Sequence, residues 1–505
     1  MRTSAGSVFA LVLALACPTG AGCKGGSLNT ASSDGSGGTP NFSTGDGASL
    51  DGSSAFAVSV SSGGVVGPPA GVWLKHYGDT ADQHASAVGI NVDGEIGVVG
   101  TVKGTIDFGN IPWTGSTTDT DLVVAQLSPD GVSQWSRRFG DSCDQRGAAV
   151  AVAPTGNVVV AGDFCGKMDF GTSVVATKGS SDIDAYIAIF DTLGEDIYAL
   201  SFGGKGSQVA RGVAVDAKGD VVLVGSFDAA FDDGSGSVPS AGMDDAFVVK
   251  LDPKGKVLWS LTFGGSEADL ARSVALDEAG NVVVGGTFAG SVDFGGGLLT
   301  ATAGHTSGFV LELDPSGKHL WSQTFDTDDD TVITAVAATP AGDVAATGYF
   351  KGKGDLGGGP FTSAGDDDVF LTRMDDTGKR AWARTVGGVK IQRASAVAFG
   401  VNGDAIIAGT SNETLDLGKV GDTIAVTKPF TSIGPNMIYA LRFDPSGTAV
   451  TAQSFDSPVP IESAGIGLDQ KYSTVLAGSF QQQIGFQFGP ANAAGSWDLF
   501  IAREF

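Results

Sequence analysis

A short segment marked by a tryptophan or tyrosine returns along this chain at a nearly constant interval. The successive marks are Trp73, Trp135, Tyr198, Trp259, Trp321, Trp382 and, with the aromatic lost, Thr451. Neighbouring marks lie 61 to 63 residues apart, except that the last interval is 69 residues. A second large apolar position follows each mark four residues later, at Tyr77, Phe139, Phe202, Phe263, Phe325, Val386 and Phe455. A repeat this long predicts a closed or stacked array of similar units.

One repeat contains four strand signals and two tight-turn signals. The copy that starts at Leu258 reads LWSLTFGG, ARSVALD, VVVGGTF and SGFVLELD, apolar runs bounded by Gly, Asp, Asn or Pro as strands are. Its first turn is AGN at 279–281, and its second is Asp-Pro-Ser-Gly at 314–317. Proline sets the backbone angle of the first central turn position, and glycine accepts a positive φ. Each repeat is therefore predicted to form four antiparallel strands, without a helical period.

The apolar runs are continuous, as at Val158–Ala161 and Val282–Val284, and do not alternate with polar residues. Such strands are expected to be covered on both faces. Sheets packed radially around a channel cover one another in this way. We therefore expect an all-β fold, a seven-bladed β-propeller with four antiparallel strands per blade. A linear β-solenoid is the alternative, but it would need polar terminal repeats, and the first and last copies look like the middle ones.

At this point the chain resembles the bacterial seven-bladed β-propeller repeat family. The motifs that carry the resemblance are RGVAVDAKGDVVLVGSF (211–227), RSVALDEAGNVVVGGTF (272–288) and AFVVKLDPKGKVLWSLTFGG (246–265). The resemblance covers residues 71–505 and implies the fold and a place on the bacterial surface, with little about activity. The hairpin DPSGKHLW also resembles the tryptophan-docking repeat of quinoprotein dehydrogenases, but seven copies and no vicinal cysteine pair argue against a quinone enzyme.

The two ends of the repeat region complement each other. The last residues, DLFIAREF (498–505), match a third strand without its turn, so the seventh blade lacks an outer strand. The segment GVWLKHYG (71–78) matches an outer strand with no blade before it. We therefore predict that the last blade is completed by the N-terminal strand.

Residues 1–22 predict a secretory signal peptide, because Arg2 precedes an apolar run at Val8–Ala16 that is too short to span a bilayer. Cys17 and Cys23 each follow small or apolar residues, LALA and TGAG, and in this the segment resembles a bacterial lipoprotein signal. The predicted lipidated residue is Cys23, with Cys17 as the alternative, and ordinary signal cleavage near Ala16 also stays open. Residues 23–70 are rich in Gly, Ser, Thr and Asp, which predicts a flexible tether. These segments place the protein in the cell envelope, at the outer membrane or cell surface, or alternatively make it secreted or periplasmic.

Acidic residues outnumber basic ones by 56 to 30, for a formal net charge of −26. This balance argues against nucleic acid as a partner and against membrane contact other than through a lipid anchor. Two cysteines lie within the repeats. If residue 152 pairs with 157, Cys143 and Cys165 fall opposite each other to within one residue, and an exported chain then favours a disulfide.

Candidate catalytic or metal-binding residues are sparse. The histidines His76, His84, His305 and His319 lie in different repeats and form no metal-binding motif. Asp326–Asp330 starts like a calcium loop, but Thr331 replaces the required glycine, so no cofactor is predicted and a Ca²⁺ site of another kind stays open. A recurrent Asp-Phe/Leu-Gly sequence favours a structural turn over a ligand ring, at Asp107, Asp169, Asp293, Asp355 and Asp416.

Four arginines, Arg146, Arg211, Arg272 and Arg393, are predicted to precede inner strands. Charge balance with nearby aspartates is the favoured interpretation, and an anionic ligand in the channel mouth is the alternative. The loop at 411–437 is longer than its equivalents and is predicted to contribute to a partner site.

The sequence thus favours a binding or scaffold protein that presents loops to an envelope or extracellular protein or glycan. A propeller lyase or hydrolase with Asp and Arg in the channel mouth is the alternative from another class, and a structural surface-layer component is a third.

Overall fold

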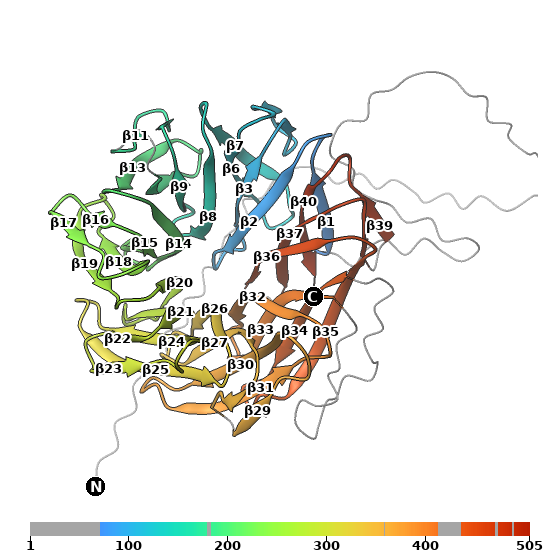
Figure 1. The fold of residues 1–505 in the computed structure, drawn as a ribbon. Coiled ribbons are helices and arrows are strands. Elements are labelled where there is room, and N and C mark those ends of the chain that lie inside the picture. The colour runs from blue at the N-terminus through green and yellow to red at the C-terminus, as the bar shows by residue number, and fades with distance from the viewer. Residues whose placement is uncertain are drawn as a thin grey trace, which may run out of the picture. The chain divides into compact units, whose positions relative to one another are not determined.

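The computed structural model describes residues 71–178, 183–357, 359–412, 436–469, 473–486 and 489–504. Its main sheets are seven blades of four antiparallel strands, arranged around a central channel (Figure 1). The prediction of a seven-bladed β-propeller is therefore confirmed. In the part of the chain that the structure describes, no helix has the length and apolar character needed to cross a membrane.

The strands are given blade by blade, from the channel to the rim. Blade 1 contains β2 (Gln83–Ile90), β3 (Ile96–Val102), β6 (Asp121–Leu127) and β7 (Ser133–Phe139). Blade 2 contains β8 (Gln145–Val152), β9 (Val158–Phe164), β12 (Asp184–Phe190) and β13 (Asp196–Phe202). Blade 3 contains β14 (Gln208–Val215), β15 (Val221–Phe227), β18 (Asp245–Leu251) and β19 (Val257–Phe263). Blades 4 and 5 contain β20 (Asp269–Leu276), β21 (Val282–Ala289), β24 (Thr306–Leu313), β25 (His319–Thr327); β26 (Thr331–Ala338), β27 (Val344–Phe350), β30 (Asp368–Met374), β31 (Arg380–Val386). Blades 6 and 7 contain β32 (Gln392–Phe399), β33 (Ala405–Ser411), β34 (Asn436–Phe443), β35 (Ala449–Ser457); β36 (Ile461–Leu468), β37 (Thr474–Phe480), β40 (Asp498–Glu504), β1 (Trp73–Tyr77).

The middle strands of a blade are the most deeply buried, because neighbouring blades pack on both of their faces. Every residue of β9 and β12 is buried, which explains why their sequences are continuous apolar runs. The connections between first and second strands, and between third and fourth strands, are tight turns at one end of the ring, which we call the tight-turn face. The longer connections lie at the opposite end, the long-loop face.

The marking aromatic residue of six of the seven blades docks on the next blade. Trp259 and Trp382 donate their indole N–H to the carbonyl oxygens of Pro315 and Pro445, in the outer turn of the following blade, at 3.0 and 2.9 Å. The glycine of that turn lies under the aromatic ring with a positive φ, at Gly131, Gly194, Gly255, Gly317, Gly378 and Gly447. A Cβ atom at these glycines would lie only 2.4 to 3.1 Å from the ring. Glycine is therefore required twice, for its backbone angle and for the close approach.

The ring is closed by strands from both ends of the described chain. β1 pairs antiparallel with β40, with Trp73 opposite Arg503 and Tyr77 opposite Leu499, and thereby supplies the outer strand of blade 7. Trp73 then docks on blade 1 by donating to the Pro129 carbonyl oxygen at 3.1 Å. The predicted completion of the last blade by the N-terminal strand is confirmed. β1 thereby covers the edge that β40 would otherwise leave unpaired.

In the six blades where the structure describes it, the connection between second and third strands holds an additional two-stranded hairpin that was not predicted from the sequence. These rim hairpins are β4–β5 (Thr105–Ile106, Trp113–Thr114), β10–β11 (Lys167–Asp169, Val174–Ala176), β16–β17 (Ala230–Asp232, Ser237–Pro239), β22–β23 (Ser291–Asp293, Leu298–Thr300), β28–β29 (Lys353–Asp355, Pro360–Thr362) and β38–β39 (Gln483–Phe486, Gly489–Asn492). Figure 1 shows several of them at the periphery of the ring.

Each rim hairpin inserts a large apolar side chain between its own blade and the outer strand of the previous blade. The contacts join Tyr77 to Phe108, Phe139 to Phe170, Phe202 to Phe231, Phe263 to Phe294 and Phe455 to Phe486, with ring centroids 4.5, 4.7, 6.3, 5.4 and 5.0 Å apart. Radially arranged sheets diverge towards the rim, so an extra apolar layer is needed there to keep the interior close-packed. This contact explains the second apolar position of the repeat.

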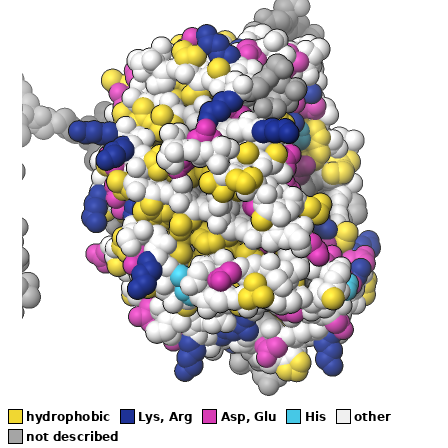
Figure 2. All heavy atoms as spheres, turned by 60° about the vertical axis from the view of Figure 1, so that its left-hand side comes forward, with side chains coloured by type: hydrophobic (Ala, Val, Ile, Leu, Met, Phe, Trp, Pro, Cys, Tyr) yellow, Lys and Arg dark blue, Asp and Glu magenta, His cyan; other side chains and the backbone are white. Residues whose placement is uncertain are grey.

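The surface of the ring mixes the two signs of charge. Basic and acidic side chains lie close together over the face drawn in Figure 2. The excess of acidic groups is therefore not gathered into one patch on this face.

We expect Gly194→Ala to destabilise the ring by about 3 kcal/mol, because the new methyl group adds a clash with Trp135 to the cost of a positive φ. Gly109→Ala is the matched control, since Gly109 has φ +97° and open space around its Cβ position. Its cost should be about 1 kcal/mol. Equal losses in chemical denaturation would contradict the docking contact.

Phe294→Ala should cost about 3 to 4 kcal/mol, because Phe294 is buried against Phe309 and Phe263 and its removal leaves a cavity at the rim. Phe294→Leu should cost under about 1.5 kcal/mol, since blade 5 carries Leu356 at the same position. Thermal unfolding of both variants measures the difference, and similar losses would rule out the filling role of the ring.

Candidate functional site

Each innermost strand contains a one-residue bulge at the same place. In blade 3, Ala210 pairs with Gly225 and Gly212 with Val224, so Arg211 is left between the two pairs. The bulged residues around the ring are Ser86, Ala148, Arg211, Arg272, Thr334, Ser395 and Ala464. A bulge changes the direction of a side chain and bends its strand. All seven bulged residues line the central channel.

The channel holds a cavity of about 310 Å³ lined by the innermost strands of all seven blades. A second cavity, of about 520 Å³, lies at its mouth on the long-loop face and shares the bulged residues of blades 1 to 5 with the first. Arg146, Arg211, Arg272 and Asp163 line this mouth. The candidate site is therefore a polar, positively charged opening on the axis of the ring.

The four arginines that were predicted to precede inner strands lie within these strands instead. They occupy two different kinds of position. Arg146 and Arg393 are the second residues of β8 and β32, at the outer lip of the channel. Arg211 and Arg272 are bulged residues deeper in the channel. Each innermost strand begins before its apolar run and contains a bulge, and the hydrophobic pattern of the sequence marks neither feature.

The two lip arginines are neutralised by carboxylates. Arg393 makes a 2.6 Å ion pair with Asp367 and stacks over the ring of Tyr349 at 4.6 Å. Arg146 contacts Asp144 at 3.2 Å and Asp163 at 3.9 Å. For these two residues the predicted charge balance holds.

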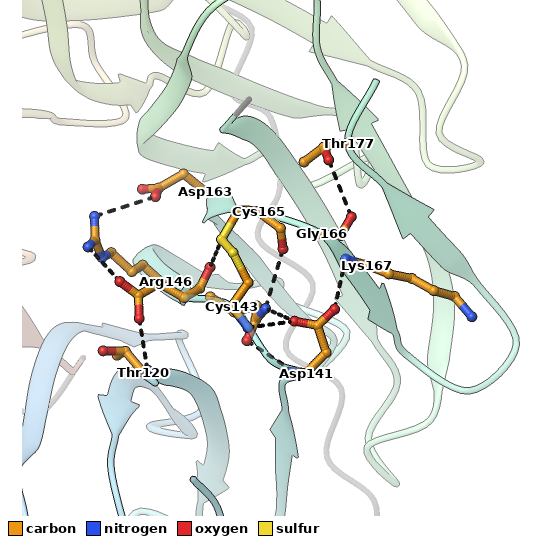
Figure 3. Close-up of a disulfide and its surroundings, with 11 residues drawn as sticks. Thr120, Asp141, Cys143, Arg146, Asp163, Cys165, Gly166, Lys167 and Thr177 are labelled. Carbon is orange, nitrogen blue, oxygen red and sulfur yellow. Dashed lines mark hydrogen bonds and ion pairs between the residues drawn. A yellow bond between two sulfur atoms is a disulfide. The ribbon is translucent and has the colours of Figure 1, made fainter. Parts of the chain in front are cut away.

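The disulfide lies next to Arg146 (Figure 3) and helps to position Asp144, which forms an ion pair with Arg146. Cys143 is bonded to Cys165, with Cα atoms 5.8 Å apart. The register differs from the predicted one, since Val152 pairs with Val158 and the bulge after Gly147 restores the alignment at the open end. The backbone N–H of Cys165 donates to the Asp144 carbonyl oxygen, and the Asp144 side chain accepts a hydrogen bond from Thr120. The hydrogen bond from the backbone N–H of Thr120 to the Asp144 carboxylate is the main reason why the pKa of Asp144 is lowered.

Arg211 and Arg272 differ from the lip arginines because no described carboxylate forms an ion pair with either. The Nε atom of Arg211 is buried and has no hydrogen-bond partner among the described residues. The Nε atom of Arg272 lies 3.5 Å from Thr287 Oγ1. Burial and the neighbouring charge of Arg211 lower the pKa of Arg272. Two guanidinium groups on adjacent blades, neither in an ion pair with a described carboxylate, make this part of the channel suited to an anion.

Asp163 is a candidate functional residue that was not predicted from the sequence. It lies opposite Arg146 on the neighbouring strand β9 and is only 8 % exposed. Burial raises its pKa to about 6, against the attraction of Arg146 and Arg211. The signal was present in the alignment of the repeats, because Thr101, Ser226, Thr287, Tyr349, Thr410 and Ser479 occupy the same place in the other blades.

The predicted histidines are not brought together, and one of them joins the aspartate-rich loop. His84 contacts Glu462 at 3.1 Å, His76 contacts Asp498 at 3.6 Å, and His319 contacts Ser322 at 3.2 Å. Ligand atoms of His305, Asp329 and Asp330 lie within 4.8 Å of one another. One nitrogen and two oxygens suit a transition metal better than Ca²⁺, which takes six to eight oxygen ligands. The calcium site stays a prediction.

The recurrent aspartates form turns, as predicted. Asp107, Asp169, Asp293 and Asp355 each accept a hydrogen bond from the glycine N–H two residues later, at 2.7, 3.1, 2.8 and 2.7 Å. Asp416 and residues 413–435 of the 411–437 loop lie outside the described residues, as do Cys17, Cys23 and the whole of 1–70.

No protein-family model matches the chain. It is 23% identical over 350 residues to an uncharacterized WD repeat-containing protein, L264, of Acanthamoeba polyphaga mimivirus, covering 64% of the chain and 21% of that protein. It is 24% identical over 189 residues to the regulatory protein FlaEY of Caulobacter vibrioides, covering 36% of the chain and 20% of that protein. The chain thus spans about a fifth of the length of these relatives.

Two solved propellers are similar at low sequence identity. The WD40 propeller domain of Doa1 has a TM-score of 0.38 and 11% identity, covering 85% of this chain and 96% of that one. Sqt1 from Chaetomium thermophilum has a TM-score of 0.41 and 10% identity, covering 86% of this chain and 100% of that one. The fold assignment therefore rests on the sheet topology of the chain itself.

The raised pKa of Asp163 predicts a pH-dependent cost. Its ionisation disfavours the folded state, so the cost is absent below about pH 4, grows towards pH 6 and stays constant above. Asp163→Asn should remove this cost and gain about 2 kcal/mol relative to the natural protein between pH 4 and pH 7, measured by denaturation. Asp144→Asn is the control of opposite sign, because the lowered pKa of Asp144 stabilises the fold above pH 4. A pH-independent difference for Asp163→Asn would contradict the assignment.

Proposed function

We propose that the chain is a binding protein of the cell envelope that presents its long-loop face to a protein or glycan partner. In this proposal a lipid on Cys23, or alternatively on Cys17, holds the protein to the membrane through the tether at 23–70. The resemblance to the bacterial propeller repeat family supports the surface location. The observation that carries the binding role is the channel mouth, where two arginines form no ion pair with a described carboxylate.

The closed ring supports a role as a rigid scaffold. β1 and β40 join both ends of the described chain in one sheet, and each docked tryptophan ties one blade to the next. Loops held on such a frame keep a fixed arrangement without having to contribute to the core.

The direction of β1 supports the proposed orientation. Trp73, at its start, bonds to the outer turn of blade 1, and this turn lies on the tight-turn face. The chain that precedes Trp73 therefore joins the ring at that face. A tether there leaves the long-loop face, with the channel mouth, directed away from the membrane.

A second candidate function is a lyase or hydrolase that uses the channel mouth, and Asp163 is the observation in its favour. A buried carboxyl with a pKa near 6 next to an arginine is suited to general acid–base chemistry. In this case Asp163→Asn should abolish turnover of a bound polymer and leave its binding intact.

Anchoring is tested by fractionation of cells that express the full chain. Cys23→Ser should move the protein from the membrane to the soluble fraction, while Cys17→Ser should leave it in the membrane. The reverse pattern would assign the lipid to Cys17. Soluble protein in every case would contradict the lipid anchor.

The presented face is tested with two matched cysteine variants in blade 3. Ala241→Cys lies on the long-loop face and Ala217→Cys on the tight-turn face, and both positions are exposed. A membrane-impermeant maleimide should label position 241 first on intact cells, with equal rates after solubilisation. A bulky polyethylene glycol maleimide at 241, and not at 217, should block capture of the envelope partner by the purified full chain. Equal behaviour of the two variants would rule out this face.

A further inference from the structure

We propose that the channel mouth binds the carboxylate of an acidic sugar, with Arg211 and Arg272 as its two donors. This assignment rests on the proposed function and names the ligand class of the same face. Arginine presents a planar fork of N–H groups that matches the two oxygens of a carboxylate, so two adjacent arginines can hold one carboxylate from both sides.

The arrangement of charge is the first support. The chain has 56 acidic and 30 basic residues, yet no described acidic residue forms an ion pair with Arg211 or Arg272. In the same ring, Arg393 has Asp367 and Arg146 has Asp144. The buried Nε of Arg211 lacks a hydrogen-bond partner among the described residues, and such a group is costly to leave unsatisfied. An incoming oxyanion would satisfy it.

The position of the pair is the second support. Both arginines occupy the bulge of adjacent innermost strands, β14 and β20, and therefore project into the channel from neighbouring blades. They are held by backbone geometry and not by a carboxylate. Burial, and to a lesser extent repulsion from Arg211, lower the pKa of Arg272.

The surroundings of the pair favour a sugar. The mouth cavity of about 520 Å³ is also lined by the hydroxyl-bearing residues Ser86, Thr101, Thr120 and Thr334. Hydroxyl groups donate and accept hydrogen bonds, and so can pair with the hydroxyls of a saccharide unit. An acidic sugar carries several hydroxyl groups beside its carboxylate, whereas an acidic peptide side chain carries the carboxylate alone. An acidic peptide is therefore the less favoured occupant.

Asp163 makes the predicted binding depend on pH. The groups that face it are Arg146 on β8, Arg211 on β14, Tyr186 on β12 and Asp144 before β8. Protonation of Asp163 near pH 6 removes a negative charge from the mouth, whereas a sugar carboxyl stays ionised above about pH 5. Affinity should therefore rise several-fold as the pH falls from about 7.5 to 5.5.

The test is calorimetric titration of the full chain with oligogalacturonate and with its methyl ester, which has the same hydroxyls but no charge. Arg211→Gln and Arg272→Gln should each weaken oligogalacturonate binding about tenfold or more. Arg393→Gln is the matched control and should change affinity less than about twofold, since Asp367 already neutralises Arg393. Asp163→Asn should remove the pH dependence. Unchanged melting temperatures show that the variants fold.

Two further probes, inorganic phosphate and a polyglutamate peptide, distinguish a sugar carboxylate from other anionic ligands. Equal affinity for the ester, or binding that survives both arginine substitutions, would overturn it. Binding of inorganic phosphate or of a polyglutamate peptide without binding of oligogalacturonate would also overturn the sugar assignment. These titrations use purified protein, so they can fail while the labelling of positions 241 and 217 succeeds, and the proposed function would then stand with another ligand.

Discussion

The contact between an outer tryptophan and a glycine turn of the next blade is the interaction on which the ring depends. It joins hydrogen bonding to close packing, because the indole N–H of Trp259 reaches Pro315 while its ring covers Gly317. The contact recurs at the rim, where adjacent sheets are furthest apart and share the least core. Each blade therefore fixes the angle between its own sheet and the sheet of the following blade. Small deviations in these angles do not add up around the ring, and the ring can close.

A ring held together at its rim leaves its centre free for binding. The bulges of the innermost strands place seven side chains around the axis, and the nature of these side chains affects the fold little. Serine, alanine, threonine and arginine all occur there. Arg211 and Arg272 illustrate the consequence, since two neighbouring like charges are tolerated in the channel while the blades that carry them stay packed.

Features marked by the interval or the hydrophobic pattern of the repeat could be predicted from the sequence, and features that leave no such mark could not. The constant interval between tryptophans gave the blade number, and the spare strand at 71–78 gave the closure. The rim hairpins were missed because their strands are only two to four residues long and are joined by glycine-rich turns. The bulge was missed because one unpaired residue leaves no mark in a hydrophobic pattern. The repeat alignment marks the position of Asp163, but the raised pKa of its carboxyl could not be predicted, because its burial depends on how the strands pack in the ring.

The loss of the aromatic at Thr451 follows from the way the ring is closed. Blade 7 takes its third and fourth strands from β40 and β1, which no turn connects, so a tryptophan on blade 6 would find no glycine to cover. The missing outer turn of blade 7 thus explains why blade 6 carries Thr451 in place of a tryptophan. A circular permutant that joins residue 504 to residue 71 through Asp-Pro-Ser-Gly, and opens at another outer turn, would move this record. Thr451 would then be the misfit, and the tryptophan preceding the new opening would be dispensable.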